Sequence, residues 1–236
     1  MTTRTPSPAA AGPGSRCSLL SESERAIAAS VRGFGEQRVL PDIAEWYERG
    51  ELPEARQLAK ELGALGVLGM HLEGYGCAGA SAVDYGLACL ELEAIDSGLR
   101  SLVSVQGSLA MFAIWRFGSE EQKNEWLPRM AAGEAIGCFG LTEPDHGSDP
   151  AGMTTRARRD GDDYVLNGTK QFISGGGFND VSSYTVYTSD LSMKIDRAAD
   201  NLRLFEGRAE AMSRSACQSR ACDAGSKGAV ISSATR

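Results

Sequence analysis

Histidine is scarce in this sequence of 236 residues, and no two cysteines are spaced as a Cys-x-x-Cys pair. The two histidines are His71 and His146, and the six cysteines are scattered from Cys17 to Cys222. Because structural zinc sites need clustered cysteine and histidine, we predict no metal site. The scattered cysteines also lack the pattern of a disulfide framework and favour reduced thiols in a cytoplasmic protein.

The sequence also lacks any run of about 18 apolar residues, so we predict no membrane-spanning helix. It has no excess of basic residues either. Its 31 acidic residues outnumber its 24 lysines and arginines, which gives a net charge of -7. Such a chain offers no basic face to a phosphate backbone, so we expect no nucleic-acid partner. The length of 236 residues allows one large or two small domains, and the 42% hydrophobic and 23% charged residues are typical of a globular protein.

The first twenty residues are rich in Pro, Ala, Gly and Ser and contain no acidic residue. They have no apolar core, so a secretory signal is not predicted. Their basic charge leaves a mitochondrial transit peptide open as an alternative, although three prolines and the lack of an amphipathic period argue against it. We expect residues 1–20 to form a disordered tail.

Residues 21–135 have the pattern of an all-helical domain. Capping boxes, in which a serine precedes an acid or amide by three positions, start at Ser21 and Ser119. Apolar residues then recur at helical spacing, for example at Leu58, Leu62 and Leu65, and again at Val83, Leu87, Leu90 and Ile95. These patterns predict helices over 21–41, 53–65, 82–96, from 98 onward and over 119–133, with a glycine-rich loop over 74–79.

From residue 136 the pattern changes to short apolar segments separated by Gly, Asn and Asp, which predicts β-strands. The strands are expected at 136–141, 153–157, 164–166, 171–174 and 181–186. A helical first half followed by strands indicates an α+β fold, with an incomplete antiparallel β domain over 136–188. Residues 189–236 have few large apolar side chains, so we expect a loosely structured tail with at most one weak helix over 198–211.

The segment from 137 to 174 carries the residue types that a flavin ring needs. An isoalloxazine ring requires apolar contacts on one face, hydroxyl or amide donors along its edge, and close approach by the backbone. Donors near the edge that gains negative charge on reduction stabilise the reduced ring. Without these neighbours, residues 141–144 are only a strand end entering a turn. The candidate cofactor-binding residues are Phe139, Leu141, Thr142, Gly147, Ser148, Phe172 and Ser174.

Several sequence blocks resemble, in the same order, the acyl-CoA dehydrogenases, and most closely the glutaryl-CoA dehydrogenases. The resemblance covers residues 21–180 and is carried by blocks at 75–79, 91–106, 117–122 and 137–170. The last block contains Gly-Leu-Thr-Glu-Pro, Gly-Ser-Asp and Leu-Asn-Gly-Thr-Lys. The resemblance implies FAD as the cofactor, held by the candidate residues above. Where the family has Trp and Thr, this sequence has Phe172 and Ser174, which keep an aromatic ring and a hydroxyl.

The run Arg100, Ser101 and Ser104 resembles the Arg-Ser-x-x-Ser run that binds the distal carboxylate of the substrate in glutaryl-CoA dehydrogenases. A guanidinium can hold a carboxylate with two hydrogen bonds while hydroxyls fill its remaining lone pairs. The alternative is an ordinary i,i+4 ion pair between Asp96 and Arg100, although we expect Gly98 to break the helix between them. The substrate-binding residues implied by the resemblance are Arg100, Ser101, Ser104 and Ser148.

Five other candidates have simpler interpretations. Glu143 is placed like a catalytic acid, but beside a proline at a strand end it is interpreted as a hydrogen-bond anchor. His146 is interpreted as a solvated turn residue, and His71 as a packing or capping residue. Trp115 and Trp126 lie on helical faces and are interpreted as core or interface residues. We therefore assign no catalytic residue within the sequence.

The resemblance implies oxidation of an acyl-CoA thioester at its α,β-carbons and, for glutaryl-CoA, decarboxylation to crotonyl-CoA. For the intact family member it also implies electron-transfer flavoprotein as the electron acceptor and a homotetramer, which we do not expect this chain to form. The implied location is the cytoplasm, or the mitochondrial matrix in a eukaryote. The family takes its carboxylate base and much of its FAD contact from a C-terminal helical domain, and nothing after Asp180 matches that domain. We therefore expect a truncated, inactive dehydrogenase. The alternative is a non-catalytic remnant that binds an acyl-CoA or a partner subunit.

Overall fold

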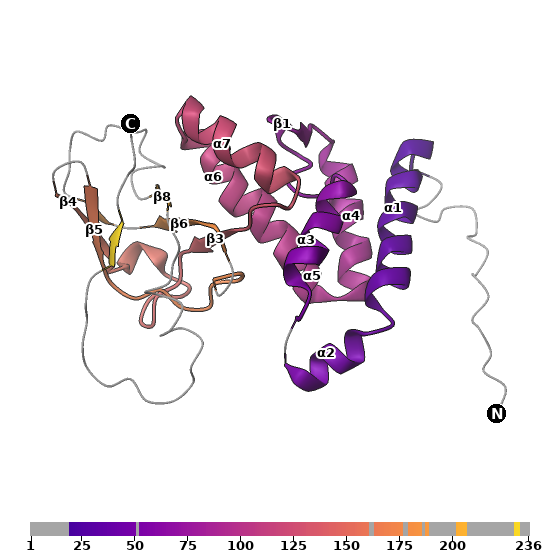
Figure 1. The fold of residues 1–236 in the computed structure, drawn as a ribbon, viewed down its shortest axis with the longest axis horizontal. Coiled ribbons are helices and arrows are strands. Elements are labelled where there is room, and N and C mark those ends of the chain that lie inside the picture. The colour runs from indigo at the N-terminus through magenta and orange to yellow at the C-terminus, as the bar shows by residue number, and fades with distance from the viewer. Residues whose placement is uncertain are drawn as a thin grey trace.

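Helices gather in one half of the molecule and most strands in the other (Figure 1). The computed structural model describes residues 19–50, 52–160, 163–176, 179–185, 187–188, 202–206 and 229–231. Two π-helical segments, η2 (Gly35–Val39) and η3 (Val105–Met111), directly follow α1 and α5. The α-helices described are α1 (Glu22–Phe34), α2 (Ile43–Arg49), α3 (Ala55–Ala64), α4 (Ala82–Ile95), α5 (Ser97–Ser104), α6 (Phe112–Phe117) and α7 (Glu120–Ala131).

Local capping starts three of these helices. Ser21 Oγ accepts a hydrogen bond from Glu24 N at 3.2 Å, and the Glu24 carboxylate accepts one from Ser21 N at 2.6 Å. The same reciprocal arrangement is present at Ser119, so both predicted capping boxes are confirmed. A third capping box, Ser81 with Asp84, opens α4. The sequence pattern missed it because the usual third-position residue is Glu or Gln rather than Asp.

A continuous apolar core holds the helical half together. Leu58 and Leu62 of α3 are fully buried, as predicted, whereas Leu65 is 39% exposed because α3 ends at Ala64. Burial of a leucine side chain contributes about 1.5–3 kcal/mol relative to its exposure. Other members of this core include Val31, Val39, Trp46, Leu68, Leu92, Leu99 and Val103.

Helix α4 buries a different face from the one that its sequence indicates. Ala88 and Leu92 are fully buried, whereas Val83 and Leu90 are 50% and 57% exposed. Apolar residues occur all around this helix, so periodicity alone does not identify the buried side. The predicted helix is confirmed, and of its four predicted apolar positions Ile95 packs against the core while Val83 and Leu90 are exposed.

Beyond the helices, the strands form two larger sheets. In one, the order is β3 (Gly137–Gly140), β6 (Val181–Thr185) and β8 (Leu202–Glu206). In the other, it is β7 (Tyr187–Thr188), β4 (Arg156–Asp160), β5 (Asp163–Asn167) and β9 (Ala229–Ile231). The α+β class is confirmed, but β3 with β6 and β4 with β7 pair in parallel. The expectation of a purely antiparallel domain is corrected there, because long connections allow the later strand to run in the same direction as the earlier one.

Several predicted elements differ from the structure. Residues 171–173 are irregular rather than a strand, because Phe172 has a left-handed backbone with φ of 57°. The strand expected from 153 begins only at Arg156, after the 3-10 turn η4 (Pro150–Gly152). The weak helix expected over 198–211 is contradicted at residues 202–206, where pairing with β6 gives strand β8. The rest of that range, and the predicted tail up to residue 18, lie outside the described residues.

The glycine-rich loop expected over 74–79 contains a tight hairpin, in which β1 (Glu73–Gly74) pairs with β2 (Cys77–Ala78). Both central residues of its turn, Tyr75 and Gly76, have positive φ, the geometry of a two-residue hairpin turn. Trp115 Nε1 donates a hydrogen bond to Glu73 O at 2.9 Å, which fixes the hairpin against α6.

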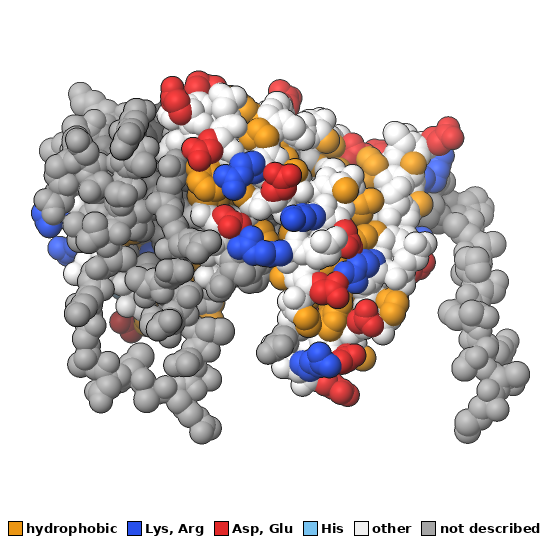
Figure 2. Space-filling view, in the orientation of Figure 1, with side chains coloured by type: hydrophobic (Ala, Val, Ile, Leu, Met, Phe, Trp, Pro, Cys, Tyr) orange, Lys and Arg blue, Asp and Glu red, His pale blue; other side chains and the backbone are white. Residues whose placement is uncertain are grey.

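Charges are mixed over the surface of the helical half. Figure 2 shows acidic and basic side chains intermingled on the visible face rather than gathered in one basic region. None of the helices described has the length and hydrophobicity of a membrane span. Within the described ranges there is also no group of three or more His, Cys, Asp or Glu side chains arranged to hold a metal.

Candidate functional site

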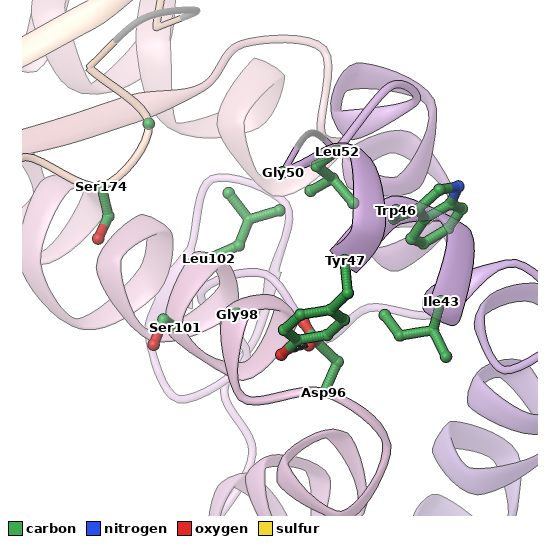
Figure 3. A pocket seen from close by; sticks show the side chains of 11 residues that line it. Ile43, Trp46, Tyr47, Gly50, Leu52, Asp96, Gly98, Ser101, Leu102 and Ser174 are labelled. Atoms are coloured by element: carbon green, nitrogen blue, oxygen red, sulfur yellow. Dashed lines mark hydrogen bonds between the residues drawn. The ribbon is translucent and has the colours of Figure 1, made fainter. Parts of the chain in front are cut away.

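A pocket lies where the helical half meets the segment after β5 (Figure 3). It has a volume of about 500 Å³ and is lined from α2, from the α4–α5 junction and from residues 174–175. Ser101, predicted to bind substrate, and Ser174, predicted to bind flavin, both line it. The fold thus brings one residue of each predicted set to the same cavity. Most of the remaining lining is apolar and includes Ile43, Trp46, Leu52 and Leu102.

Asp96 lines this pocket. Its backbone is extended, so α4 ends and α5 begins at this one residue. One carboxylate oxygen accepts a hydrogen bond from Leu99 N at 2.7 Å, and the other accepts one from Tyr47 Oη at 2.9 Å. The hydrogen bond to Asp96 raises the pKa of Tyr47. The helix break therefore lies at Asp96 and not at Gly98, which lies in the first turn of α5.

Arg100 pairs with Glu93 and not with Asp96, so the i,i+4 alternative is wrong. The Arg100 Nε lies 2.5 Å from the Glu93 carboxylate, and Arg100 Nη1 donates to Ser104 Oγ at 3.4 Å. The hydrogen bond to Glu93 raises the pKa of Arg100. Neither Arg100 nor Ser104 is among the residues that line the pocket, whereas Ser101 is. The three residues therefore lie on two faces of α5.

The predicted flavin edge is formed by two segments that lie side by side. Gln171 N donates a hydrogen bond to Thr142 O at 2.9 Å, and Lys170 Nζ donates one to Leu141 O at 2.9 Å. These bonds place Leu141 and Thr142 beside the chain that leads into Phe172. The Phe172 ring is 84% exposed on a left-handed backbone, an unusual state for a large aromatic residue.

The other predicted cofactor residues are more dispersed. Phe139 is partly buried in β3, and Gly147 and Ser148 are exposed in the loop that follows Glu143. None of these three lines the pocket described above. Ser148, predicted to contact both cofactor and substrate, therefore does not share this pocket with Ser101 and Ser174.

Glu143 is a buried anchor between three segments of the chain. Its carboxylate accepts hydrogen bonds from Thr154 N at 2.6 Å, Thr154 Oγ1 at 2.9 Å, Thr155 N at 3.0 Å and Lys170 Nζ at 2.8 Å. Burial alone would raise the pKa of Glu143, but the hydrogen bonds from Lys170 and the threonines outweigh it and hold that pKa far below its usual value. A carboxylate that stays ionised and fully engaged cannot act as an acid, which agrees with the anchor interpretation.

The histidines and tryptophans contribute to packing. His71 lies 4.6 Å from the Tyr85 ring between centroids, and burial lowers its pKa, so the imidazole is neutral at pH 7. His146 is partly buried, and a Cβ on Gly152 would lie 2.4 Å from its Nδ1. The expectation of a solvated His146 is corrected, because its ring packs on that glycine. Trp115 and Trp126 pack against the core cluster formed with α6 and α7.

Sequence reasoning did not single out Lys170, Glu93 or the Tyr47–Asp96 pair. Lys170 follows the end of β5 in the polar run Asn-Gly-Thr-Lys-Gln, so no local pattern marks it as a buried ion-pair residue. Glu93 lies seven positions before Arg100, but the two residues belong to different helices, so spacing along one helix does not predict their contact. The contact between Tyr47 and Asp96 joins α2 to the α4–α5 junction and is equally non-local.

Two domain models match the chain. The acyl-CoA dehydrogenase N-terminal domain matches residues 21–134, and the acyl-CoA dehydrogenase middle domain matches residues 138–206. The second match runs past residue 188, where the β domain was expected to end, and includes β8. The resemblance identified from the sequence ended at Asp180, and the domain match extends it to residue 206.

Individual relatives are similar over part of their length. The human mitochondrial short-chain specific acyl-CoA dehydrogenase is 36% identical over 183 residues, which are 77% of this chain and 42% of that protein. A glutaryl-CoA dehydrogenase from Mycobacterium smegmatis in complex with FADH2 is 59% identical, with a TM-score of 0.75, over 83% of this chain and 48% of that one. A solved structure of the electron transferring flavoprotein of Acidaminococcus fermentans contains a chain that is 31% identical, with a TM-score of 0.68, over 81% of this chain and 49% of that one.

The chain therefore spans less than half the length of each of these proteins. The segment that matches the N-terminal domain contains the helices α1 to α7, and the segment that matches the middle domain begins within β3 and extends to the end of β8. On these matches, the chain belongs to the acyl-CoA dehydrogenase family.

Proposed function

We propose that this chain provides the helical and flavin-facing parts of an FAD-dependent dehydrogenase that oxidises glutaryl-CoA. The observation that carries the proposal is the pocket of about 500 Å³ that is lined by both Ser101 of α5 and Ser174 of the segment after β5. An apolar cavity between a helix and a flavin-facing segment suits an acyl group whose α,β-carbons must reach the ring. The 59% identity to the M. smegmatis glutaryl-CoA dehydrogenase supports the choice of substrate.

The residues on the strand side fit a flavin. Phe172 offers an exposed aromatic ring on a strained backbone, a state that occurs at ligand-binding positions more often than elsewhere. Thr142 and Ser174 bring hydroxyls to the same segment pair, and Phe139 and Leu141 add apolar contacts. Gly147 and Ser148 are exposed and can approach the cofactor with backbone and hydroxyl. FAD, when bound, supplies the two-electron acceptor that these side chains cannot provide.

The residues on the helix side fit the free carboxylate at the distal end of glutaryl-CoA. Arg100 and Ser104 share one face of α5, where the guanidinium and the hydroxyl are already in contact. The Arg100–Glu93 pair is partly exposed, so it contributes little stability, and a ligand carboxylate can compete for the guanidinium. Ser101 meets the acyl group from the pocket side. Monocarboxylic acyl-CoAs have no group for Arg100 to bind, and they are the alternative substrates.

Within the part of the chain that the structure describes, neither Asp96, which lines the pocket, nor Glu143 is available as a base for the α-proton. Asp96 caps α5 and accepts from Tyr47, and Glu143 is buried in its ion pair with Lys170. We therefore expect no turnover by these 236 residues alone. Electron-transfer flavoprotein as acceptor, assembly as a homotetramer and decarboxylation to crotonyl-CoA belong to the same proposal for the complete enzyme. A non-catalytic role, binding an acyl-CoA or a partner subunit, is the second candidate, favoured by the engagement of these carboxylates.

Blocking the pocket tests the proposal. In calorimetric titrations, glutaryl-CoA should bind the chain more tightly than free CoA, and Ser101→Phe should remove that difference because the new ring fills the cavity. Ser97→Phe, on the same helix but outside the pocket lining, is the matched control and should bind as the unmodified chain does. Equal binding of glutaryl-CoA and CoA by the unmodified chain would contradict the proposal. Dye reduction by the chain with added FAD would instead refute the expected lack of turnover.

A further inference from the structure

Gln106 joins the helix that carries the predicted substrate residues to the strand that carries the predicted flavin edge. It lies in the π-helical segment η3, two residues after Ser104, and is 2% exposed. Its Nε2 donates to Met130 O at 3.1 Å and to Ala135 O at 2.8 Å. Its Oε1 accepts from Gly137 N at 2.8 Å. One amide thus satisfies three backbone groups along the turn from α7 into β3.

Around Gln106, η3 and β3 are closely packed. A Cβ on Gly137 would lie 2.5 Å from Ala110 Cβ and 2.6 Å from Met130 Cε, so strand and helix meet as closely as a glycine allows. On another side of η3, a Cβ on Gly107 would lie 2.9 Å from Gly69 N. The segment is therefore held between the strand and the chain at residue 69.

The chain directions make this junction relevant to the site. Helix α5 runs without interruption into η3, so the hydroxyls of Ser101 and Ser104 are carried by the same rigid body as Gln106. Strand β3 begins at Gly137, which Gln106 binds, and leads directly to Leu141 and Thr142. A π-helical segment in this position is a further sign of a functional constraint, since such segments occur frequently at functional sites.

We propose that Gln106 is a positioning residue that fixes the spacing between α5 and the flavin-facing segment, and so sets the acyl length that fits between them. The inference rests on the proposed function. Gln106 touches neither predicted ligand and acts through Gly137 and the helix that it belongs to. A five-carbon diacyl group must place one end at Arg100 and its reacting carbons at the flavin, so a change in this spacing alters length selectivity.

Two variants and one control test the proposal in the full chain. Gln106→Leu keeps the size of the side chain but removes the hydrogen bonds of the amide to Gly137 N and Ala135 O, whereas Met130 O keeps its bond from Gly133 N. Gln106→Asn keeps the amide but is one methylene shorter, and it is the variant to use if the leucine variant does not fold. Gln57→Leu removes an exposed hydrogen bond to Glu61 and is the control. Amide exchange at Gly137 should accelerate about tenfold or more in the Gln106 variants, with no change in α1 and none in the control.

The second readout is selectivity among succinyl-, glutaryl- and adipyl-CoA, measured by calorimetric titration. The preference of the unmodified chain for glutaryl-CoA should fall by about fivefold or more in Gln106→Asn. Unchanged exchange at Gly137 would overturn the proposal, and so would accelerated exchange with unchanged selectivity, because Gln106 would then be only a structural link. If the unmodified chain binds none of the three thioesters, the proposed function fails and length selection fails with it. The Gly137 result still decides separately whether the hydrogen-bonded link exists.

Discussion

Replacing Glu143 with glutamine leaves the Lys170 ammonium buried without its counter-charge. The two side chains are 3% and 1% exposed, and their charged atoms lie 2.8 Å apart. Removing one partner of a buried ion pair costs about 3–5 kcal/mol, because the remaining charge stays desolvated. The glutamine amide also turns a donor toward a site where every neighbour donates. We expect Glu143→Gln to lower the free energy of unfolding by about 4 kcal/mol.

The reverse change should cost less. In Lys170→Met the Glu143 carboxylate keeps its bonds from Thr154 N, Thr154 Oγ1 and Thr155 N. Methionine also fills most of the space of the lysine stem. We expect a loss of about 2 kcal/mol. The double variant should be more stable than Glu143→Gln alone, because it also removes the buried ammonium, and the coupling energy should exceed about 1 kcal/mol.

Urea denaturation followed by tryptophan fluorescence measures all three variants. A change in midpoint at constant slope reports stability alone. Equal losses for the two single variants, or strictly additive losses in the double variant, would refute the reasoning. Such a result would mean that Lys170 does not depend on Glu143 for its charge balance and that the anchor is an ordinary set of neutral hydrogen bonds.

Four further predictions follow from the same contacts. Because the folded-state pKa of Glu143 is lowered, its contribution to stability is present above the unfolded pKa of about 4.3 and is lost as pH falls from there through the folded-state pKa. A Glu143→Gln variant with the same acid sensitivity as the unmodified chain would contradict this. Gly137→Ala should lower the unfolding free energy by about 1–3 kcal/mol, since the new methyl overlaps Ala110, and an unchanged midpoint would argue against the close packing of η3 and β3. Ser81→Ala should lower the free energy of unfolding by about 1 kcal/mol by removing the cap of α4, and an unchanged midpoint in the same denaturation assay would contradict this. The purified chain should not retain FAD at a 1:1 ratio, since the predicted contacts come from one side of the ring only; a stoichiometric flavin absorbance after gel filtration would show otherwise.

Local signals in the sequence predicted the helices better than the strands. The capping boxes at Ser21 and Ser119 need only residues three positions apart, and both are present. The parallel pairing of β3 with β6 joins residues such as Gly137 and Val181, whose contact depends on the whole intervening chain. The strand expected at 171–174 fails because Phe172 adopts a left-handed backbone, which no side-chain pattern signals in a residue other than glycine.

The site was predictable as a set of residue types and not as an arrangement. The sequence indicated Ser101 and Ser174 separately, and only the fold places both at one pocket. Glu143 was recognisable as an anchor from the proline beside it. Its partner Lys170 is 27 positions away, so the ion pair needed the tertiary structure. The alternative pairing of Arg100 with Asp96 fails because Asp96 caps α5 at the α4–α5 junction, a role that emerges only when the helices meet.

The most direct test of the central claim is a comparison of glutaryl-CoA and butyryl-CoA binding by calorimetric titration. We predict that the chain prefers glutaryl-CoA and that Arg100→Ala removes the preference, with a loss of roughly 10- to 100-fold for glutaryl-CoA and little change for butyryl-CoA. Arg49→Ala, which breaks the exposed ion pair with Glu45, is the matched control and should leave both affinities unchanged. Equal losses for both thioesters, or no preference in the unmodified chain, would contradict the assignment of Arg100 to the substrate carboxylate.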